Sequence, residues 1–382
     1  MWLIGISLLL FLAYALLILF YTKSWKQIPI QSPKPTDALP GHPVTFTVII
    51  PARNEASNIL RLLESIKQQQ YPAHLFEVIV VDDHSDDKTA ALAEQFRTAN
   101  RASFSMTLIR LTGEALNSYK KKAIETGIAA SRHEWIVCTD ADCMVPAGWL
   151  QGFAQLIHET DPVFIAAPVA FMEAGTLVNV FQDLDFLTLQ GITGASVYKN
   201  IHTMCNGANL AYRRDVFEEV NGFKGIDTIA SGDDMLLMHK IWKRYPQRIA
   251  YLKSEQTIVK TMAAPTWKAF INQRIRWASK ATYYDDTRIF AVLLLVYLFN
   301  LSFLVLLIAA FTNNCYLYAL LIFWGFKTLI EYPFIKSVAQ FFNKQSRLKY
   351  FFLFQPLHIG YTILAGFLGS FGRYEWKGRQ VK

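Results

Sequence analysis

The sequence predicts an α/β fold with a mainly parallel β-sheet and helices on both of its faces, flanked by transmembrane helices. From residue 45 onward, short apolar runs alternate with segments of helical periodicity. Each apolar run is continuous, which is typical of a strand buried on both faces of a parallel sheet. Hydrophobic residues make up 52% of the 382 residues and gather at the two ends of the chain, a larger share than a soluble domain alone explains.

Residues 1–22 predict an N-terminal transmembrane anchor. The first 21 residues carry no charge and are about long enough to cross the core of a bilayer. They lack a basic start and a small-residue cleavage pattern, so we interpret the segment as a retained anchor rather than a signal peptide. Lys23 and Lys26 follow it, and the positive-inside rule therefore places the next domain in the cytosol. The five prolines of residues 23–44 then predict a linker.

Residues 45–263 predict a cytosolic domain in which strands and helices alternate. The predicted strands cover residues 45–50, 78–81, 106–109 and 135–138, and the predicted helices cover residues 58–69, 88–96 and 235–242. Crossovers between parallel strands are right-handed in almost all proteins. Ligands bind outside the carboxyl ends of such strands, so we expect the polar residues that follow them to line a site.

Two carboxylates, Asp140 and Asp142, follow the predicted strand 135–138. They can present hard oxygen ligands to Mg²⁺ or Mn²⁺, and the cation in turn can neutralise a diphosphate. Alone, the pair would equally fit a turn, because Asp is a favoured turn residue. Its place directly after a buried strand favours the metal site.

Two further acidic pairs flank predicted elements. Asp82 and Asp83 follow the strand 78–81 and could accept hydrogen bonds from a base N–H and a ribose hydroxyl; the alternative is an N-cap cluster for the next helix. Asp233 and Asp234 precede the helix 235–242, where either an N-cap or a general base fits.

Residues 264–286 predict an amphipathic interfacial segment. Within it, Gln273, Arg276 and Trp277 recur at helical spacing, so one face carries an amide, a guanidinium and an indole. The Arg can bind phosphate and the Trp can stack on a sugar or an acceptor. The alternative is a helix that anchors in the membrane interface through basic and Trp side chains, and both interpretations can hold together.

Three hydrophobic membrane segments are expected within residues 289–371. They cover residues 289–311, 316–335 and 351–371. Lys327 and Glu331 stand four residues apart in the second segment, where they could pair at a functional site or lie near a helix end and snorkel. Three simple spans would place the basic tail, residues 372–382, outside, so either the last segment is re-entrant or the charge rule fails there.

Charge and cysteine content limit the class of protein. The four cysteines show no paired framework and no zinc-type spacing, which fits a reducing compartment and buried small hydrophobic side chains. The net charge of +8 favours attraction to anionic headgroups and to a diphosphate. The basic residues are dispersed and no nucleic-acid motif accompanies them, so we expect no nucleic-acid partner.

The acidic motifs at residues 82–83, 140–142 and 233–234, followed by the motif at residues 273–277, resemble in type and order those of the family 2 glycosyltransferases. These are inverting enzymes of GT-A fold that include cellulose, chitin and hyaluronan synthases and ceramide glucosyltransferases. The resemblance covers residues 44–277 and the flanking membrane segments. One departure is Gly232-Asp233-Asp234, where the family more often has Thr-Glu-Asp; the last Asp is kept. The resemblance implies a nucleoside pocket lined by Pro51, Arg53, Glu55 and Asp83. It also implies a metal-diphosphate site at Asp140 and Asp142, with Lys121 or Lys122 nearby, and a general base at Asp234. The donor and acceptor site would be completed by Gln273, Arg276 and Trp277.

The resemblance implies a hexosyltransferase of the inner or plasma membrane with a cytosolic GT-A catalytic domain. It would transfer a sugar, with inversion, from a UDP-linked nucleotide-sugar donor to a hydroxyl of a lipid or glycan acceptor, with Mg²⁺ or Mn²⁺ as cofactor and membrane lipids as partners. Two alternatives remain. The motif at residues 273–277 also fits a processive polysaccharide synthase, while a non-catalytic nucleotide-binding membrane protein is disfavoured by the intact Asp142 and Asp234.

Overall fold

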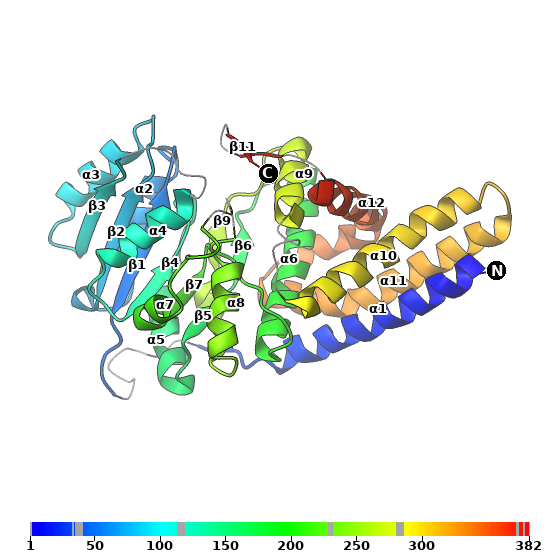
Figure 1. Cartoon of the computed structure of the whole chain (residues 1–382), viewed down its shortest axis with the longest axis horizontal. Coiled ribbons are helices and arrows are strands. Elements are labelled where there is room, and N and C mark those ends of the chain that lie inside the picture. The colour runs from blue at the N-terminus through cyan, green and yellow to red at the C-terminus, as the bar shows by residue number, and fades with distance from the viewer. Residues whose placement is uncertain are drawn as a thin grey trace. The chain divides into compact units, whose positions relative to one another are not determined.

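The computed structural model describes residues 2–32, 34, 41–112, 119–227, 229, 232–279, 286–371, 374–376 and 379–381. These residues form two compact units (Figure 1). The α/β unit comprises Pro29–Met172 and Thr203–Met262, and the helical unit comprises Met1–Ile28, Glu173–His202 and Ala263–Lys382. Parts of the predicted linker, interfacial segment and basic tail, at residues 33, 35–40, 280–285, 372–373, 377–378 and 382, lie outside the described residues.

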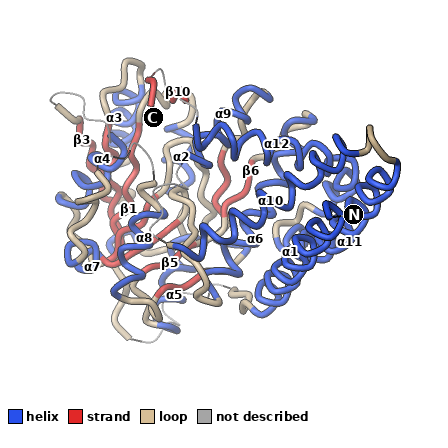
Figure 2. The backbone as a smooth tube through the Cα atoms, turned by 45° about the vertical axis from the view of Figure 1, so that its right-hand side comes forward, coloured by secondary structure: helices blue, strands red, loops and turns tan. Residues whose placement is uncertain are grey.

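The α/β unit is built on a seven-stranded sheet of order β3-β2-β1-β4-β7-β5-β8 (Figure 2). β7 runs antiparallel to its neighbours β4 and β5, and the other pairings are parallel. This confirms the predicted mainly parallel sheet. A separate parallel pair joins β6 and β9. The strands are β1 (Phe46–Ala52), β2 (Phe76–Asp82), β3 (Ser105–Arg110), β4 (Trp135–Cys138), β5 (Phe164–Ala166), β6 (Val169–Phe171), β7 (Leu210–Arg213), β8 (Ile249–Tyr251) and β9 (Val259–Thr261).

Burial follows the position of each strand in the sheet. Every residue of β2 and β4 is buried, whereas β3, which was expected to be buried on both faces, has no buried residue. That expectation is wrong for β3 because this strand forms the edge of the sheet and has a neighbour on one side only. The apolar run at residues 106–109 predicted a strand correctly, but it did not indicate that this strand lies at the exposed edge.

Helices connect the strands of the α/β unit. In α2 the predicted stripe of Ile59, Leu62, Leu63 and Ile66 is fully buried, as the helical periodicity required. α4 packs against β1 and β2. The helices are α2 (Ile59–Lys67), α3 (Thr89–Ala99), α4 (Tyr119–Ala129), α5 (Trp149–Thr160), α7 (Arg214–Glu219) and α8 (Met235–Arg244), with single 3₁₀ turns η2 (Ala73–Leu75) and η3 (Glu255–Thr257).

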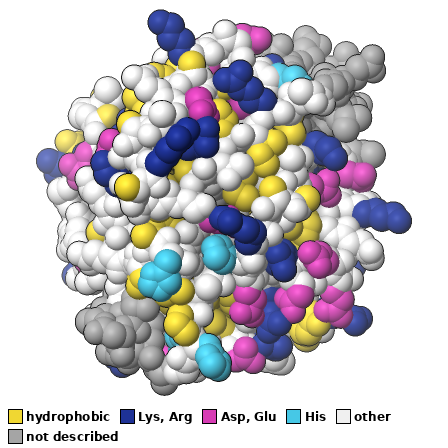
Figure 3. Space-filling view, turned by 90° about the vertical axis from the view of Figure 1, so that its left-hand side faces the viewer, with side chains coloured by type: hydrophobic (Ala, Val, Ile, Leu, Met, Phe, Trp, Pro, Cys, Tyr) yellow, Lys and Arg dark blue, Asp and Glu magenta, His cyan; other side chains and the backbone are white. Residues whose placement is uncertain are grey.

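The register of the sheet brings several polar residues to one edge. β1 and β2 run in parallel until Ala52 lies opposite Asp82, and β4 ends where Cys138 lies opposite Ile49. The carboxyl ends of these three strands therefore meet at the same edge. On the outer face shown in Figure 3, Lys and Arg side chains are interspersed with Asp and Glu.

A buried asparagine holds the segment that leads into β7. The side chain of Asn209 donates to the carbonyl oxygens of Pro168 and Thr257 at 2.7 and 2.8 Å and accepts from Trp149 Nε1 at 2.8 Å. Because all of these groups are satisfied inside the core, the residues just before Asn209 have a fixed position. Gly207 is among them.

The helical unit contains long apolar helices. They are α1 (Trp2–Gln27), α6 (Leu177–Tyr198), α9 (Trp267–Ala278), α10 (Thr287–Ala309), α11 (Asn314–Phe341) and α12 (Phe351–Phe371), with the turn η5 (Gln345–Tyr350) and the hairpin β10 (Tyr374–Trp376) and β11 (Arg379–Val381). Figure 1 shows α1, α10 and α11 side by side. Three helical segments within the described ranges are long and apolar enough to cross a membrane: Trp2–Gln27, Thr287–Ala309 and Gln345–Gly369.

The predicted segment 316–335 lies in α11, a 28-residue helix that is not among those three. The two charged residues of the predicted segment form a buried pair, with Lys327 Nζ 2.6 Å from Glu331 Oε1. Lys327 is fully buried near the middle of the helix, so the alternative of a side chain snorkelling from a helix end is wrong. The predicted pairing is confirmed, and a functional role of the pair stays a prediction.

Close packing inside the helical unit depends on glycine. A Cβ added at Gly191 of α6 would lie 2.5 Å from Val338 Cγ2 and 2.7 Å from Phe334 Cζ, both on α11. A Cβ at Gly366 of α12 would lie 2.7 Å from the Tyr297 ring on α10. The absence of a side chain at these two positions lets neighbouring helices approach each other closely.

At the opposite edge of the sheet from the converging strand ends, a buried carboxylate stabilises the α/β unit. Glu77 accepts hydrogen bonds from Thr47 Oγ1 at 2.8 Å, from Arg132 N at 2.7 Å and from Arg132 Nε at 2.8 Å. Burial alone would raise the pKa of the Glu77 carboxyl, but these hydrogen bonds and the charge of Arg132 lower it below its ordinary 4.5.

We predict that Glu77→Gln lowers the free energy of unfolding by about 1–3 kcal/mol at neutral pH, because an amide N–H₂ would face protein donors. Since the folded pKa is the lower one, the carboxylate stabilises the fold above pH 4.5 and its contribution is lost as the pH falls through the folded pKa. Urea unfolding of the full-length protein in detergent, at neutral and acidic pH, measures both effects. Glu64→Gln, on the exposed face of α2, is the matched control. Equal stabilities of the two variants at neutral pH would contradict the assignment.

Candidate active site

The first part of the site follows β1 and β2. Asp82 ends β2 and Asp83 follows it, and each is only 5% exposed. Arg53, just after β1, donates from Nη1 to the backbone oxygen of Asp83 at 3.0 Å, and the same nitrogen lies 3.9 Å from Asp83 Oδ2. His84 Nδ1 lies 2.9 Å from Asp83 Oδ1. Two buried carboxylates are thus held at the sheet edge beside a guanidinium.

Hydrogen bonds join the loop after β1 to the loop after β2. Ser85 Oγ accepts from Asn54 N at 3.0 Å, and Thr89 Oγ1 accepts from Glu55 N at 2.7 Å. Asp87 Oδ1 accepts from Thr89 N at 2.9 Å, at the first residue of α3. Asp87 therefore serves the start of the helix, and Asp82 and Asp83 do not.

A second chain of contacts links this region to the turn after β4. Asn58 Nδ2 donates to Glu55 Oε2 at 2.7 Å, and Arg61 Nη2 donates both to Asn58 Oδ1 at 2.8 Å and to the backbone oxygen of Asp142 at 3.3 Å. Pro51, in β1, lies opposite Val81 of β2. Glu55, a predicted nucleoside residue, is therefore linked through Asn58 and Arg61 to the backbone of Asp142, a predicted metal residue.

Asp140 and Asp142 lie in the turn that follows β4. Cys143 N donates to the backbone oxygen of Asp140 at 3.0 Å, so the turn interpretation holds for the backbone while both carboxylates stay at the sheet edge. Among the described residues, no three His, Cys, Asp or Glu side chains converge on one point. Two carboxylates would still suit a Mg²⁺ or Mn²⁺ ion whose remaining ligands are phosphate oxygens and water.

The basic residue that contacts these carboxylates is Lys120. Its Nζ lies 2.7 Å from Asp140 Oδ1 and 3.1 Å from Asp233 Oδ2. Lys122, which we expected near the diphosphate, is exposed, and Lys121 is buried and donates to the backbone oxygen of Ile229. Three consecutive lysines point in three directions on α4, and the sequence alone does not fix the phase of that helix.

Burial would lower the pKa of the Lys120 ammonium, but the surrounding carboxylates outweigh it. Asp140, Asp233 and Asp234 together raise that pKa well above its ordinary value. Lys120 therefore remains a cation, and its positive charge offsets the repulsion among the negatively charged carboxylates.

Asp234 is the N-cap of α8. Its Oδ1 accepts from Met235 N at 2.7 Å, and its Oδ2 accepts from Gly207 N at 3.0 Å. The N-cap alternative is thereby confirmed for this residue. Each carboxylate oxygen retains a further lone pair, so capping and proton acceptance are compatible.

Gly207 lies at the centre of the cluster. A Cβ at this position would lie 3.2 Å from Lys120 Nζ, 3.3 Å from Asp233 Oδ2 and 3.6 Å from Asp234 Cβ. A side chain at this position would therefore displace the ends of Lys120 and Asp233 by a few tenths of an ångström, whereas its contact with Asp234 would be ordinary. Sequence reasoning missed Gly207 because it belongs to no recognised motif.

Gln273, Arg276 and Trp277 lie on α9 and belong to the helical unit. Arg274, between them, is the buried charged residue of the described part of this segment. Its Nη2 lies 2.5 Å from Asp185 Oδ2 on α6, and its guanidinium lies 4.1 Å from the centre of the Trp277 ring. Sequence analysis singled out the neighbours of Arg274 and not Arg274 itself, because only the fold reveals the buried acidic partner.

Comparison with known proteins decides the family. A family model described as "Glycosyl transferase family 2" matches residues 47–220, and one described as "Glycosyl transferase family group 2" matches residues 135–364, more than half of the chain. The chain belongs to the family 2 glycosyltransferases. This confirms the family that the motifs predicted.

Curated relatives of this family 2 chain include Glycosyltransferase AglE of Haloferax volcanii, 31% identical over 190 residues, which are 49% of this chain and 58% of that protein. Probable glycosyltransferase YdaM of Bacillus subtilis is 26% identical over 242 residues, which are 61% of this chain and 54% of that protein. The chain thus spans little more than half the length of these relatives.

Among solved structures, mannosyltransferase PcManGT of Pyrobaculum calidifontis, in complex with GDP-Man and Mn²⁺, resembles this glycosyltransferase chain in fold. The TM-score is 0.61 at 22% identity, over 93% of this chain and 99% of that one. The similarity confirms the predicted GT-A fold.

We predict that Gly207→Ala slows turnover of a nucleotide-sugar by about tenfold, because a displacement of a few tenths of an ångström at Lys120 and Asp233 disturbs the site. Turnover of the purified full-length family 2 chain measures this. Gly175→Ala is the control, since a Cβ there meets nothing within 4 Å. Unchanged turnover in Gly207→Ala would show that the cluster tolerates the added methyl group and is not catalytic.

Proposed function

We propose that the protein transfers a sugar from a nucleotide-sugar to a hydroxyl acceptor at a membrane, with inversion of the anomeric configuration. The observation that carries the proposal is the cluster of Asp140, Asp233 and Asp234 around Lys120, at the carboxyl edge of the sheet where Asp83 also follows a strand. Ligands bind at this edge in open α/β sheets. Membership of the family 2 glycosyltransferases supports the same reaction.

The nucleoside would bind at the buried carboxylates beside Arg53. Asp82 and Asp83 are acceptors in a region with little water, which suits a base N–H and ribose hydroxyls. Pro51 and Glu55 flank them in β1 and the following loop. The prediction of a UDP-linked donor stays a prediction, and it is tested by competition among nucleoside diphosphates.

The diphosphate would bind at Asp140 and Asp142 together with a divalent cation. When bound, Mg²⁺ or Mn²⁺ supplies positive charge that offsets the charge of the leaving diphosphate. The ammonium of Lys120 adds a positive charge 2.7 Å from Asp140. Lys120 would therefore take the role that we had expected of Lys121 or Lys122.

Asp234 would act as the general base. Its carboxylate accepts the proton of the acceptor hydroxyl while the oxygen of that hydroxyl bonds to the anomeric carbon. The bond from the anomeric carbon to the diphosphate breaks, and the diphosphate leaves with the electron pair. Hydrogen bonds from Met235 N and Gly207 N hold the carboxylate in place. The roles expected of Gln273, Arg276 and Trp277 stay predictions.

We further propose that the helical unit lies in the inner or plasma membrane, with the α/β unit in the cytosol. Three segments are long and apolar enough to cross a bilayer. Lys23 and Lys26 lie at the C-terminal end of the first of them, and Arg347 and Lys349 lie in the turn before α12. Basic residues at these ends favour the cytosolic side. A lipid or glycan acceptor would meet the donor at that surface.

The proposed reaction is tested with the full-length protein in nanodiscs and a panel of labelled nucleotide-sugars. We expect one donor to be consumed and its label to move into a lipid or glycan product. Separation by size distinguishes a single transfer from processive synthesis. Consumption of no donor, with nucleoside diphosphates failing to bind, would exclude a transferase and would equally exclude a nucleotide-binding role.

Removal of the metal gives a sharper prediction. EDTA should abolish turnover, Mn²⁺ or Mg²⁺ should restore it, and Asp142→Asn should lower it by about 10²-fold or more, since a metal supplies several kcal/mol of charge stabilisation. Asp161→Asn is the control, because Asp161 ends α5 on the surface in a left-handed conformation that Asn also adopts. Full turnover in EDTA would exclude the metal role.

Substitutions at Asp234 and at Asp83 should affect different properties, turnover in the first case and nucleotide affinity in the second. Asp234→Asn retains an N-cap oxygen, so we expect nucleotide affinity to stay within a few-fold while turnover falls by about 10² to 10⁴. Asp83→Ala should instead weaken nucleotide binding by about 1–3 kcal/mol, because a buried hydrogen bond is lost. Calorimetric titration of a nucleoside diphosphate, paired with turnover, separates the two. Equal losses of affinity would place Asp234 in the donor pocket and make Asp233 the next candidate for the base.

A further inference from the structure

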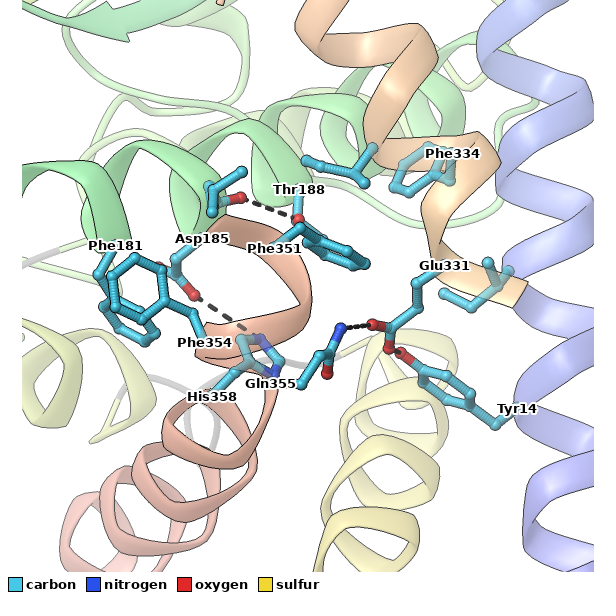
Figure 4. A pocket seen from close by; sticks show the side chains of 13 residues that line it. Tyr14, Phe181, Asp185, Thr188, Glu331, Phe334, Phe351, Phe354, Gln355 and His358 are labelled. Atoms are coloured by element: carbon cyan, nitrogen blue, oxygen red, sulfur yellow. Dashed lines mark hydrogen bonds and ion pairs between the residues drawn. The ribbon is translucent and has the colours of Figure 1, made fainter. Parts of the chain in front are cut away.

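A cavity of about 50 Å³, lined mostly by apolar side chains with a few polar groups, lies inside the helical unit, among α1, α6, α11 and α12 (Figure 4). Aromatic side chains of Phe181, Phe334, Phe351 and Phe354 line part of it. Its polar lining residues are Tyr14, Asp185, Thr188, Glu331, Gln355 and His358. Ionisable side chains among apolar helices cost free energy, and they usually mark a functional site.

One wall of the cavity is a hydrogen-bonded cluster around Glu331. Lys327 Nζ lies 2.6 Å from Glu331 Oε1 and donates to Gln355 Oε1 at 2.8 Å, and Gln355 Nε2 donates to Glu331 Oε2 at 2.6 Å. The Tyr14 hydroxyl also donates to Glu331, as Figure 4 shows. Lys327 itself is fully buried and does not line the cavity.

The opposite wall is built around Asp185. Its Oδ2 lies 2.5 Å from Arg274 Nη2, its Oδ1 accepts from the Tyr361 hydroxyl, and His358 Nε2 lies 3.9 Å from Oδ1. Arg274, like Lys327, is not a lining residue. His358 Nδ1 is buried and has no hydrogen-bond partner among the residues that the structure describes.

The two walls together favour one kind of occupant. Both carboxylates face the cavity, while the two cations that balance them lie behind the walls. The hydroxyl hydrogens of Tyr14 and Thr188 are already donated, to Glu331 and to the backbone of Leu184. These two hydroxyl groups therefore offer lone pairs, and no free hydrogen, to an occupant. A hydroxyl can donate to such acceptors, whereas an anionic phosphate would meet two negative charges.

The cavity also lies at a depth that a lipid headgroup can reach. Gln355 follows Lys349 by six residues, and Tyr14 precedes Lys23 by nine. At 1.5 Å per residue, the cavity lies roughly 9–14 Å along the helices from the basic residues that we assign to the cytosolic interface.

We propose that this cavity binds the uncharged, hydroxyl-bearing head of a membrane lipid, which serves as the acceptor of the sugar. The inference rests on the proposed function and narrows its acceptor class to lipids that carry an alcohol and no phosphate. Asp185 links the cavity to α9, because its partner Arg274 also stacks on Trp277. An occupied cavity and the expected acceptor residues of α9 thus share one buried ion pair.

The test compares two lipids with the same acyl chains. Full-length protein in phosphatidylcholine nanodiscs receives either dioleoylglycerol or dioleoyl phosphatidate, in which a phosphate replaces the free hydroxyl, and native mass spectrometry counts the lipid retained. We expect dioleoylglycerol to be retained about tenfold more than phosphatidate, the equivalent of one or two net hydrogen bonds. Equal retention of the two lipids, or retention of neither, would overturn the proposal.

Matched threonine variants locate the binding. Thr188 and Thr362 each donate to the backbone oxygen four residues earlier, at 3.0 and 2.8 Å, but only Thr188 lines the cavity. Thr188→Leu fills the cavity and should lower dioleoylglycerol retention by about tenfold, whereas Thr362→Leu should change it by less than about twofold. Should Thr188→Leu fail to fold, as judged by lost affinity for nucleoside diphosphates, His358→Leu replaces it. Undiminished retention in a folded cavity variant would overturn the site.

Failure of this inference differs from failure of the proposed function. If dioleoylglycerol is retained selectively but no nucleotide-sugar is consumed, the lipid site stands and the transferase proposal fails. If a nucleotide-sugar is consumed with another hydroxyl-bearing acceptor and dioleoylglycerol is not retained, the transferase stands and the cavity assignment is overturned.

Discussion

The ammonium of Lys120 between Asp140 and Asp233 is the interaction on which the candidate site depends. Asp140, Asp233 and Asp234 come from two separate loops, and without a counterion their charges would repel one another. Lys120 relieves that repulsion from α4, whose position against β1 and β2 is set by packing. Gly207 allows the backbone to come close enough for these groups to meet. The carboxyl ends of the strands position the loops, and the ion pairs of Lys120 with Asp140 and Asp233 hold the cluster together.

The helical unit solves a similar problem with buried pairs. Arg274 with Asp185, and Lys327 with Glu331, place opposite charges together where water is scarce, and Lys344 and Arg347 both pair with the buried Asp183 of α6. Buried pairs are costly to form and even more costly to break. They therefore add little net stability, but the pairs that join different helices specify which helix faces which. In this unit they fix α6 against α9 and η5.

Several motifs serve structure and chemistry at once. Asp234 caps α8 and is also the proposed base, and the turn at Asp140 holds its backbone while its carboxylate faces Lys120. In each case the structural role and the functional role use different atoms or different lone pairs. A residue with a good structural explanation is therefore not excluded from catalysis, and the helix start at Asp87 shows the converse case, a nearby carboxylate with a capping role.

The sequence by itself determined the parallel strands, the amphipathic helix α2, the apolar helices and the family, because these follow from local periodicity and from short motifs. It also placed Asp82, Asp83, Asp140 and Asp142 after strands, and parallel strands necessarily bring their ends together. Only the tertiary structure decided which of three consecutive lysines meets the carboxylates, that β3 lies at an exposed edge, and that Arg274 has a buried acidic partner in Asp185. These outcomes depend on helix phase, on strand order and on contacts between residues far apart in the chain. Local sequence carries little information about any of them, since each is fixed by packing between distant segments.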